Sequence, residues 1–114
     1  MSLGSFTDER GEITDLLDRE TYALTRVTTV KGAVRGNHYH PRTEQWVYLI
    51  SGQLQMAGPW GLAVLYPGEV WHTPAGEPHA WRAIEDSDCI VCAEGPRRAE
   101  AYEQDTIRLG EPLL

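Results

Sequence analysis

Short apolar stretches alternate with turn-forming residues along almost the whole chain, at intervals of about eight to twelve residues. The stretches are rich in β-branched and aromatic side chains, and Gly or Pro stands at many of their ends, which is typical of strands. The predicted strands are 22–30, 46–50, 53–57, 62–66, 69–73, 79–84 and 88–94. Many short strands separated by turns predict an all-β sandwich or barrel.

The two ends of the chain give a weaker pattern. Residues 5–20 begin with a polar turn, and the apolar stretch that follows, around Ile13, is compatible with a strand or with one helical turn. Residues 99–104 are compatible with a helical turn and 106–109 with a closing edge strand. We therefore expect one domain over 1–114, with its barrel core at about 22–94 and flanking segments at 1–21 and 95–114.

Two of the predicted strands are apolar on both faces, WVYLI at 46–50 and LAVLY at 62–66. One face of such a strand fits the interior of a barrel, and the other needs a second sheet or a partner subunit to cover it. A symmetric pair of subunits is the simplest cover for an outer face. The pattern therefore predicts a homodimer.

Composition narrows the class of protein. With 41% hydrophobic and 24% charged residues, the chain is typical of a soluble globular domain. Its net charge of −7 and its scattered Lys and Arg residues argue against nucleic acid or an anionic membrane surface as a partner. No apolar run approaches the ~20 residues of a membrane span, and the first residues lack an apolar signal core. We expect a cytoplasmic protein.

Cys89 and Cys92 form a C-x-x-C, a spacing that also occurs in redox and zinc sites. They lie in the predicted strand 88–94, where an offset of three places the two thiols on opposite faces. The sequence therefore favours reduced core or surface thiols over a redox-active or zinc-binding pair.

The candidate chemistry lies in the histidines. His38 and His40 are separated by one residue, so on an extended segment both imidazoles leave the same face. A third histidine, His79, and two neighbouring oxygen donors, Glu44 and Gln45, complete the set. Three imidazoles and one oxygen donor would make a mononuclear metal site with room for water or substrate.

Two runs of residues around these histidines resemble the two motifs of the cupin family. The first reads Gly32-x5-His38-x-His40-x4-Gln45-x6-Gly52. The second reads Gly68-x5-Pro74-x-Gly76-x2-His79. Gln45 replaces the usual glutamate, and Ala83 replaces a usual asparagine. The resemblance implies a single cupin (double-stranded β-helix or jelly-roll) barrel holding a divalent ion such as zinc, iron, manganese or nickel, with chemistry that ranges from dioxygenation to isomerisation to lyase reactions.

The fourth ligand is the point of departure from the family pattern. Strand alternation groups Gln45 with the inward Val47, whereas Glu44 shares the face of Tyr48 and reaches the site only if the preceding turn differs by one residue. We favour Gln45 and keep Glu44 as the alternative. A neutral amide leaves both charges of a divalent ion uncancelled, so metal affinity should fall and an anionic substrate should feel a stronger field.

Four further residues are candidate substrate contacts because they neighbour the ligands in sequence or in strand parity: Arg35, Tyr48, His72 and Trp81. Arg35 is the strongest, because a guanidinium can bind a carboxylate or phosphate in bidentate fashion. For Tyr48 and Trp81 core packing is the simpler interpretation, and for His72 a structural role is as well supported as a place in the pocket.

Three functions compete. The first is a metal-dependent enzyme acting on a small oxygenated or anionic substrate. The second is a metal-free isomerase or epimerase with His38 or His40 as base, since residues 35–40, RGNHYH, resemble cupin domains of capsular-polysaccharide proteins that act on nucleotide-linked sugars. Against it, no cluster of basic residues marks a diphosphate site. The third is a non-catalytic module that binds a small ligand.

Overall fold

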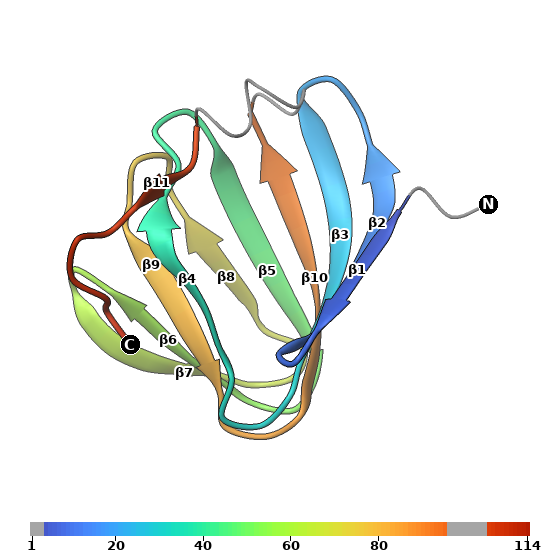
Figure 1. Ribbon diagram of the computed structural model, residues 1–114, viewed down its shortest axis with the longest axis vertical. Coiled ribbons are helices and arrows are strands. Elements are labelled where there is room, and N and C mark those ends of the chain that lie inside the picture. The colour runs from blue at the N-terminus through green and yellow to red at the C-terminus, as the bar shows by residue number, and fades with distance from the viewer. Residues whose placement is uncertain (1–3, 96–104) are drawn as a thin grey trace.

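The computed structural model describes residues 4–95 and 105–114 and shows two antiparallel sheets that face each other as the two halves of a barrel (Figure 1). The six-stranded sheet comprises, in spatial order, β1 (Ser5–Asp8), β2 (Gly11–Asp18), β3 (Tyr22–Thr29), β10 (Ser87–Glu94), β5 (Glu44–Ser51) and β8 (Val70–Thr73). The five-stranded sheet comprises β11 (Ile107–Arg108), β4 (Val34–Tyr39), β9 (His79–Ala83), β6 (Leu54–Gly58) and β7 (Gly61–Leu65). The prediction of an all-β jelly-roll barrel is confirmed.

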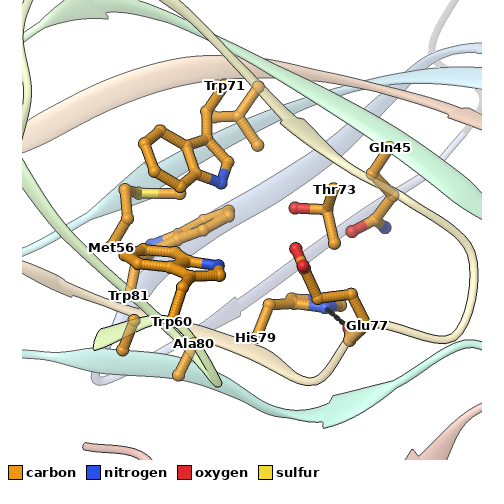
Figure 2. Close-up of a pocket in the computed structure, with 11 residues that line it drawn as sticks. Gln45, Met56, Trp60, Trp71, Thr73, Glu77, His79, Ala80 and Trp81 are labelled. Carbon is orange, nitrogen blue, oxygen red and sulfur yellow. Dashed lines mark hydrogen bonds between the residues drawn. The ribbon is translucent and has the colours of Figure 1, made fainter. Parts of the chain in front are cut away.

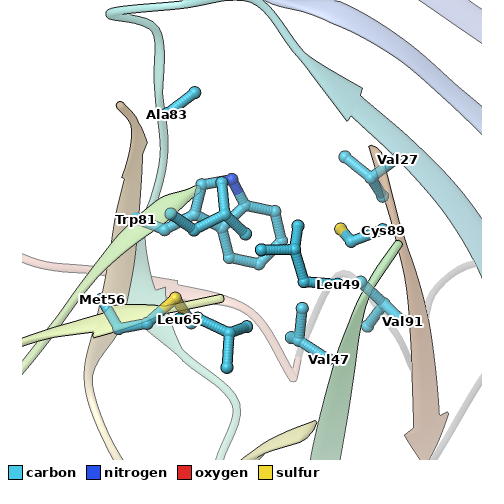
Figure 3. Packing of buried hydrophobic residues seen from close by; sticks show 10 residues of the cluster. Val27, Val47, Leu49, Met56, Leu65, Trp81, Ala83, Cys89 and Val91 are labelled. Atoms are coloured by element: carbon cyan, nitrogen blue, oxygen red, sulfur yellow. The ribbon is translucent and has the colours of Figure 1, made fainter. Parts of the chain in front are cut away.

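The core lies between the two sheets, where alternate residues of each strand point inward. On β5, Val47 and Leu49 are buried while Tyr48 and Ile50 between and beyond them are exposed. Trp81 packs among the aliphatic residues of both sheets (Figure 3). Each buried aliphatic side chain of this kind stabilises the fold by roughly 1.5–3 kcal/mol. The alternation that predicted the strands is therefore the same one that builds the core.

The ambiguous N-terminal stretch forms strands, not a helical turn. Ile13 packs against the core from β2, and β2 pairs with β3 along its length, with one irregularity after Asp15. Near the other end of the chain, β11 occupies the centre of the predicted strand 106–109 and pairs with β4. The helical turn predicted at 99–104 lies outside the described residues. In the described ranges no helix is long and apolar enough to cross a membrane.

The two cysteines lie on opposite faces of β10, as their offset predicts. Cys89 is in the core at 1% exposure, and Cys92 is half-buried on the other face. Burial of the thiol raises the pKa of Cys89 to about 12, since the apolar surroundings disfavour a thiolate. Cys89 therefore behaves as a small hydrophobic residue.

Candidate metal and substrate site

Three histidines converge at one end of the five-stranded sheet. His38 lies near the end of β4, His40 follows that strand, and His79 begins β9. Because β4 and β9 are antiparallel neighbours, with His38 opposite His79, the three rings meet at ring-centroid distances of 4.6, 4.8 and 5.3 Å. One nitrogen from each ring lies within 4.8 Å of the others. This spacing is suited to three ligands around one ion.

A β-bulge directs the first histidine into this cluster. The register between β4 and β9 shifts between Gly36 and His38, and the residue between them, Asn37, has a positive φ of 59°. Gly36 itself has φ of +96°, and a Cβ built on it would lie 2.8 Å from the carbonyl oxygen of His79. Only glycine allows the two strands to approach so closely at this point.

Two of the imidazoles are oriented by backbone carbonyl groups. His40 Nδ1 lies 3.0 Å from the carbonyl oxygen of Asp105, and His79 Nδ1 lies 3.1 Å from that of Glu77. A carbonyl oxygen can only accept, so in the neutral rings Nδ1 carries the hydrogen and Nε2 keeps its lone pair. Metal-binding histidines are commonly held in this way.

The third imidazole, that of His38, is also neutral and can donate a lone pair to a metal ion. Burial, with weaker repulsion from the other two histidines, lowers the pKa of His38 to about 3, so this ring is neutral at pH 7. Burial likewise lowers the pKa of His79. The Nδ1 atom of His38 is buried and has no hydrogen-bond partner among the residues that the structure describes. A bound cation would satisfy such a nitrogen, so the residues present fit a metal ion.

The neighbouring oxygen donors are separated by strand parity. Gln45 points to the inner face of β5 and lines the same cavity as the three histidines. The carboxylate of Glu44 is instead paired with His72 on the outer face, with Oε2 2.6 Å from Nε2. Of the two candidates, the structure therefore brings Gln45 to the cluster.

The histidines form part of the wall of a cavity of about 510 Å³, a size suited to a small molecule. The remaining lining comes from both sheets: Arg10, Ile13, Asp15, Asp18, Thr25, Val27, Arg35, Gly36, Gln45, Trp81, Val91 and Ala93. His79 and Gln45 also line a much smaller pocket of about 10 Å³, with tryptophan rings on one side and the Glu77 and Thr73 side chains on the other (Figure 2). The larger cavity is the one with room for a substrate.

Arg35 lines this cavity from β4 and is buried, at 7% exposure. Its Nε donates to Thr29 Oγ1 at 3.1 Å and its Nη2 to the Thr28 carbonyl oxygen at 3.0 Å, and no described carboxylate forms an ion pair with it. Burial lowers its pKa, although a guanidinium remains charged at neutral pH. Arg35 therefore presents a buried positive charge to the cavity and forms no ion pair with the described carboxylates.

Of the other predicted substrate contacts, Trp81 lies inside the barrel, whereas Tyr48 and His72 lie on its outer face. Trp81 lines the cavity, and its indole Nε1 donates to Thr29 Oγ1 at 3.4 Å while the ring packs in the core. Tyr48 is 44% exposed on the outer face, and His72 stacks there on Trp46 with ring centroids 5.3 Å apart. Neither Tyr48 nor His72 lines the cavity, so we assign neither to the candidate site.

Sequence reasoning missed the wall opposite the histidines. Asp15, on β2, accepts a hydrogen bond at its Oδ1 from Thr25 Oγ1 of β3 at 3.3 Å, and both residues line the cavity. Asp15 stands two residues after the inward-facing Ile13. The signal was therefore present: had the segment been interpreted as a strand, alternation would have placed this carboxylate inside.

A family model for the cupin domain matches residues 25–93. The chain belongs to the cupin family. Among curated proteins, this cupin is similar to an oxalate decarboxylase of Arthroderma benhamiae, with 29% identity over 86 residues that cover 71% of this chain and 20% of the relative. The chain thus spans about a fifth of the length of the curated relatives it matches.

Solved structures show the same fold at low identity. The capsular polysaccharide assembling protein CapF of Staphylococcus aureus aligns with a TM-score of 0.75 and 20% identity, over 96% of this chain and 33% of that one. KdgF of Halomonas sp. aligns with a TM-score of 0.71 and 21% identity, over 82% of this chain and 86% of that one. These likenesses support the single cupin barrel.

Proposed function

We propose that this cupin is an enzyme that acts on a small oxygenated, anionic substrate at a mononuclear metal site formed by His38, His40, His79 and Gln45. One observation carries the proposal: three imidazoles, two of them fixed through Nδ1, converge within 4.8 Å in the wall of a cavity large enough for a small molecule. The ion could be zinc, iron, manganese or nickel, since imidazole suits all four.

In this proposal the metal ion, Gln45 and Arg35 have different roles. A divalent ion, when bound, would supply Lewis-acid polarisation of a substrate oxygen. Gln45 would contribute a neutral oxygen, so the positive charge of the centre stays uncancelled. Arg35 would hold an acidic group of the substrate from the neighbouring wall of the cavity. The similarity to an oxalate decarboxylase supports a carboxylic acid as the substrate class.

Elemental analysis tests the metal site directly. The protein is purified without a metal-affinity column, incubated with each of the four divalent ions and dialysed, alongside the variants His40→Ala and His72→Ala. We expect close to one ion per chain in the parent protein and in His72→Ala, whose histidine lies on the outer face, and little in His40→Ala. Absence of metal from the parent protein, or equal content in both variants, would overturn the proposal.

The substrate class is tested on the metal-loaded protein. Oxalate and larger hydroxy acids are assayed for turnover and for binding, with Arg35→Gln as the variant. We expect Arg35→Gln to weaken binding of acids by about 10-fold or more, because a charge-assisted hydrogen bond is worth roughly 1.5–3 kcal/mol. Equal binding by Arg35→Gln would remove Arg35 from the substrate site. Binding of these acids without turnover would favour the non-catalytic module.

The metal-free sugar isomerase or epimerase remains the second candidate, because the wall formed by Asp15 and Thr25 offers hydrogen bonds to hydroxyl groups. The low pKa of His38 argues against that residue as the base, since a base of pKa about 3 is weak at neutral pH. His40 would then take the role. Binding of nucleotide-linked sugars at millimolar concentration by chelator-treated protein, followed by isomerisation, would favour this function over the first.

A further inference from the structure

We propose that the segment 105–114 is part of the site, and that Asp105 is the positioning residue that fixes the ring of His40. The inference deepens the proposed metal site and rests on it for its effect on metal binding. Two groups of hydrogen bonds attach this segment to the barrel, one at each end of the stretch that carries His38 and His40.

The first attachment surrounds Asp105, which is 1% exposed. Its carboxylate accepts hydrogen bonds from the backbone N–H of Arg42 at 2.8 Å and from the hydroxyl of Thr43 at 2.5 Å. Its carbonyl oxygen is the one that accepts from His40 Nδ1 at 3.0 Å, and Thr106 Oγ1 lies 3.2 Å from the same nitrogen. One residue thus connects the turn after His40 to the ring of His40.

The second attachment is at Asn37, in the bulge before His38. Its side-chain Oδ1 accepts from the backbone N–H groups of Leu113 and Leu114 at 2.7 and 3.2 Å. Its carbonyl oxygen accepts from the N–H of Leu109 at 3.0 Å. Between Asp105 and Leu109, β11 pairs with β4, and Figure 1 shows the segment running along that edge. The segment therefore lies along the edge of β4 that carries His38, on the side opposite β9.

The physical role of Asp105 follows from its side-chain carboxylate and its backbone carbonyl group. A carboxylate that accepts hydrogen bonds in the interior forms charge-assisted bonds, which are stronger than neutral ones. These bonds hold the backbone at 105, so its carbonyl oxygen stays aimed at His40 Nδ1 and keeps the hydrogen on that nitrogen. Nε2 of His40 is then the atom left with a lone pair for the ion. Without the carboxylate, the ring can rotate and exchange tautomers.

The experiment uses Asp105→Asn and Asp105→Ala in the full chain, with two readouts. The first is the tautomer of His40 in metal-free protein, from the 15N chemical shifts of its ring. The second is metal affinity, from competition with a chromogenic chelator. We expect both variants to lose the uniform Nδ1–H tautomer and to bind metal about 10- to 100-fold more weakly, the usual effect of removing support from a metal-binding histidine.

The matched control is Asp88→Asn, which breaks the ion pair with Arg26 on the outer face of the six-stranded sheet, and it should change neither readout. If Asp105→Ala does not fold, Thr43→Val removes one of the hydrogen bonds to the carboxylate at nearly constant volume, and a smaller shift of both readouts is expected. An unchanged tautomer in Asp105→Asn or in Thr43→Val overturns the inference. If the parent protein binds no metal, the proposed function fails, while the tautomer still tests the positioning role.

Discussion

Gln45 determines the charge of the proposed centre. Its amide lies on the inner face of β5, and the carboxylate of its sequence neighbour Glu44 is directed to the outer face and bonded to His72. Three neutral rings and an amide would leave a divalent ion with its full charge. Such a centre binds its ion less tightly and attracts anions more strongly than one with a carboxylate ligand.

The first prediction is that Gln45→Glu raises metal affinity. A carboxylate about 4 Å from a cation gains several kcal/mol at an effective dielectric constant of ~20 before desolvation, so an increase of roughly 10- to 100-fold is expected. Calorimetric titration with one divalent ion measures it. Glu44→Gln is the control and should leave affinity unchanged. The reverse pattern, loss in Glu44→Gln and no gain in Gln45→Glu, would make Glu44 the ligand.

The second prediction concerns the thiols. Because the pKa of Cys89 is raised to about 12 and its side chain is buried, the folded protein should react with a disulfide reagent at pH 8 through Cys92 alone. Both thiols should react in guanidinium chloride. The raised pKa also means that the protonated thiol favours the folded state, and this contribution is lost as the pH rises from about 9 toward 12. Rapid labelling of native Cys92→Ala would contradict the burial of Cys89.

Among the elements, the bulge in β4 has the largest consequence for the site. It inserts Asn37 between Gly36 and His38, so that β4 both pairs closely with β9 and presents His38 to the cluster. The positive φ of Asn37 and its bonds to the segment 105–114 belong to the same feature. The geometry of the site is therefore a property of this irregular strand and its neighbours.

The third prediction compares Gly36, which lies within β4, with Gly32, which precedes that strand. Gly36→Ala adds a Cβ 2.9 Å from Ala80 Cα as well as a residue that disfavours positive φ, so we expect a loss of more than about 3 kcal/mol in unfolding free energy and weaker metal binding. Gly32 also has a positive φ, +87°, but open space around it. Gly32→Ala should cost only about 1–2 kcal/mol, from backbone strain alone. Equal losses in urea denaturation would show that the close contact is unimportant.

At the scale of the whole molecule, apolar side chains are exposed along the side of the barrel where the edge strands β7 and β8 lie. Val70 is 59% exposed and lies opposite Tyr48 on the outer face, while Leu62 and Val64 are exposed on β7. Unpaired edges with apolar residues favour association with another copy of the chain.

The fourth prediction is a homodimer that buries this side of the barrel, at β7 and β8. Light scattering at low micromolar concentration should give twice the mass of 12.8 kDa for the parent protein and one chain for Val70→Lys. Leu16→Lys is the control, since Leu16 is similarly exposed but lies on β2, at the far side of the same sheet. A parent protein that is monomeric under these conditions would contradict the prediction.

The sequence by itself determined the strands and the direction of their side chains. Side chains alternate along a strand with a period of two residues, and this alternation is a local property. The sequence alone therefore predicts that His38 and His40 share a face and that Gln45 points inward. The same local rule separates Cys89 from Cys92. The glycine-framed motifs then indicated the family, because their spacing reflects turns that only a few residue types can form.

Only the tertiary structure decided which distant segments meet. The family resemblance placed His79 in the same site as His38, but the pairing of β4 with β9 that brings them together depends on how strands select neighbours across long loops, and no local period encodes this. The same holds for Asp15 on the opposite wall and for Asp105 behind His40, both in segments that the sequence placed outside the barrel core. Their roles arise from burial and hydrogen bonding between residues far apart in the chain, and these exist only once the two sheets have closed.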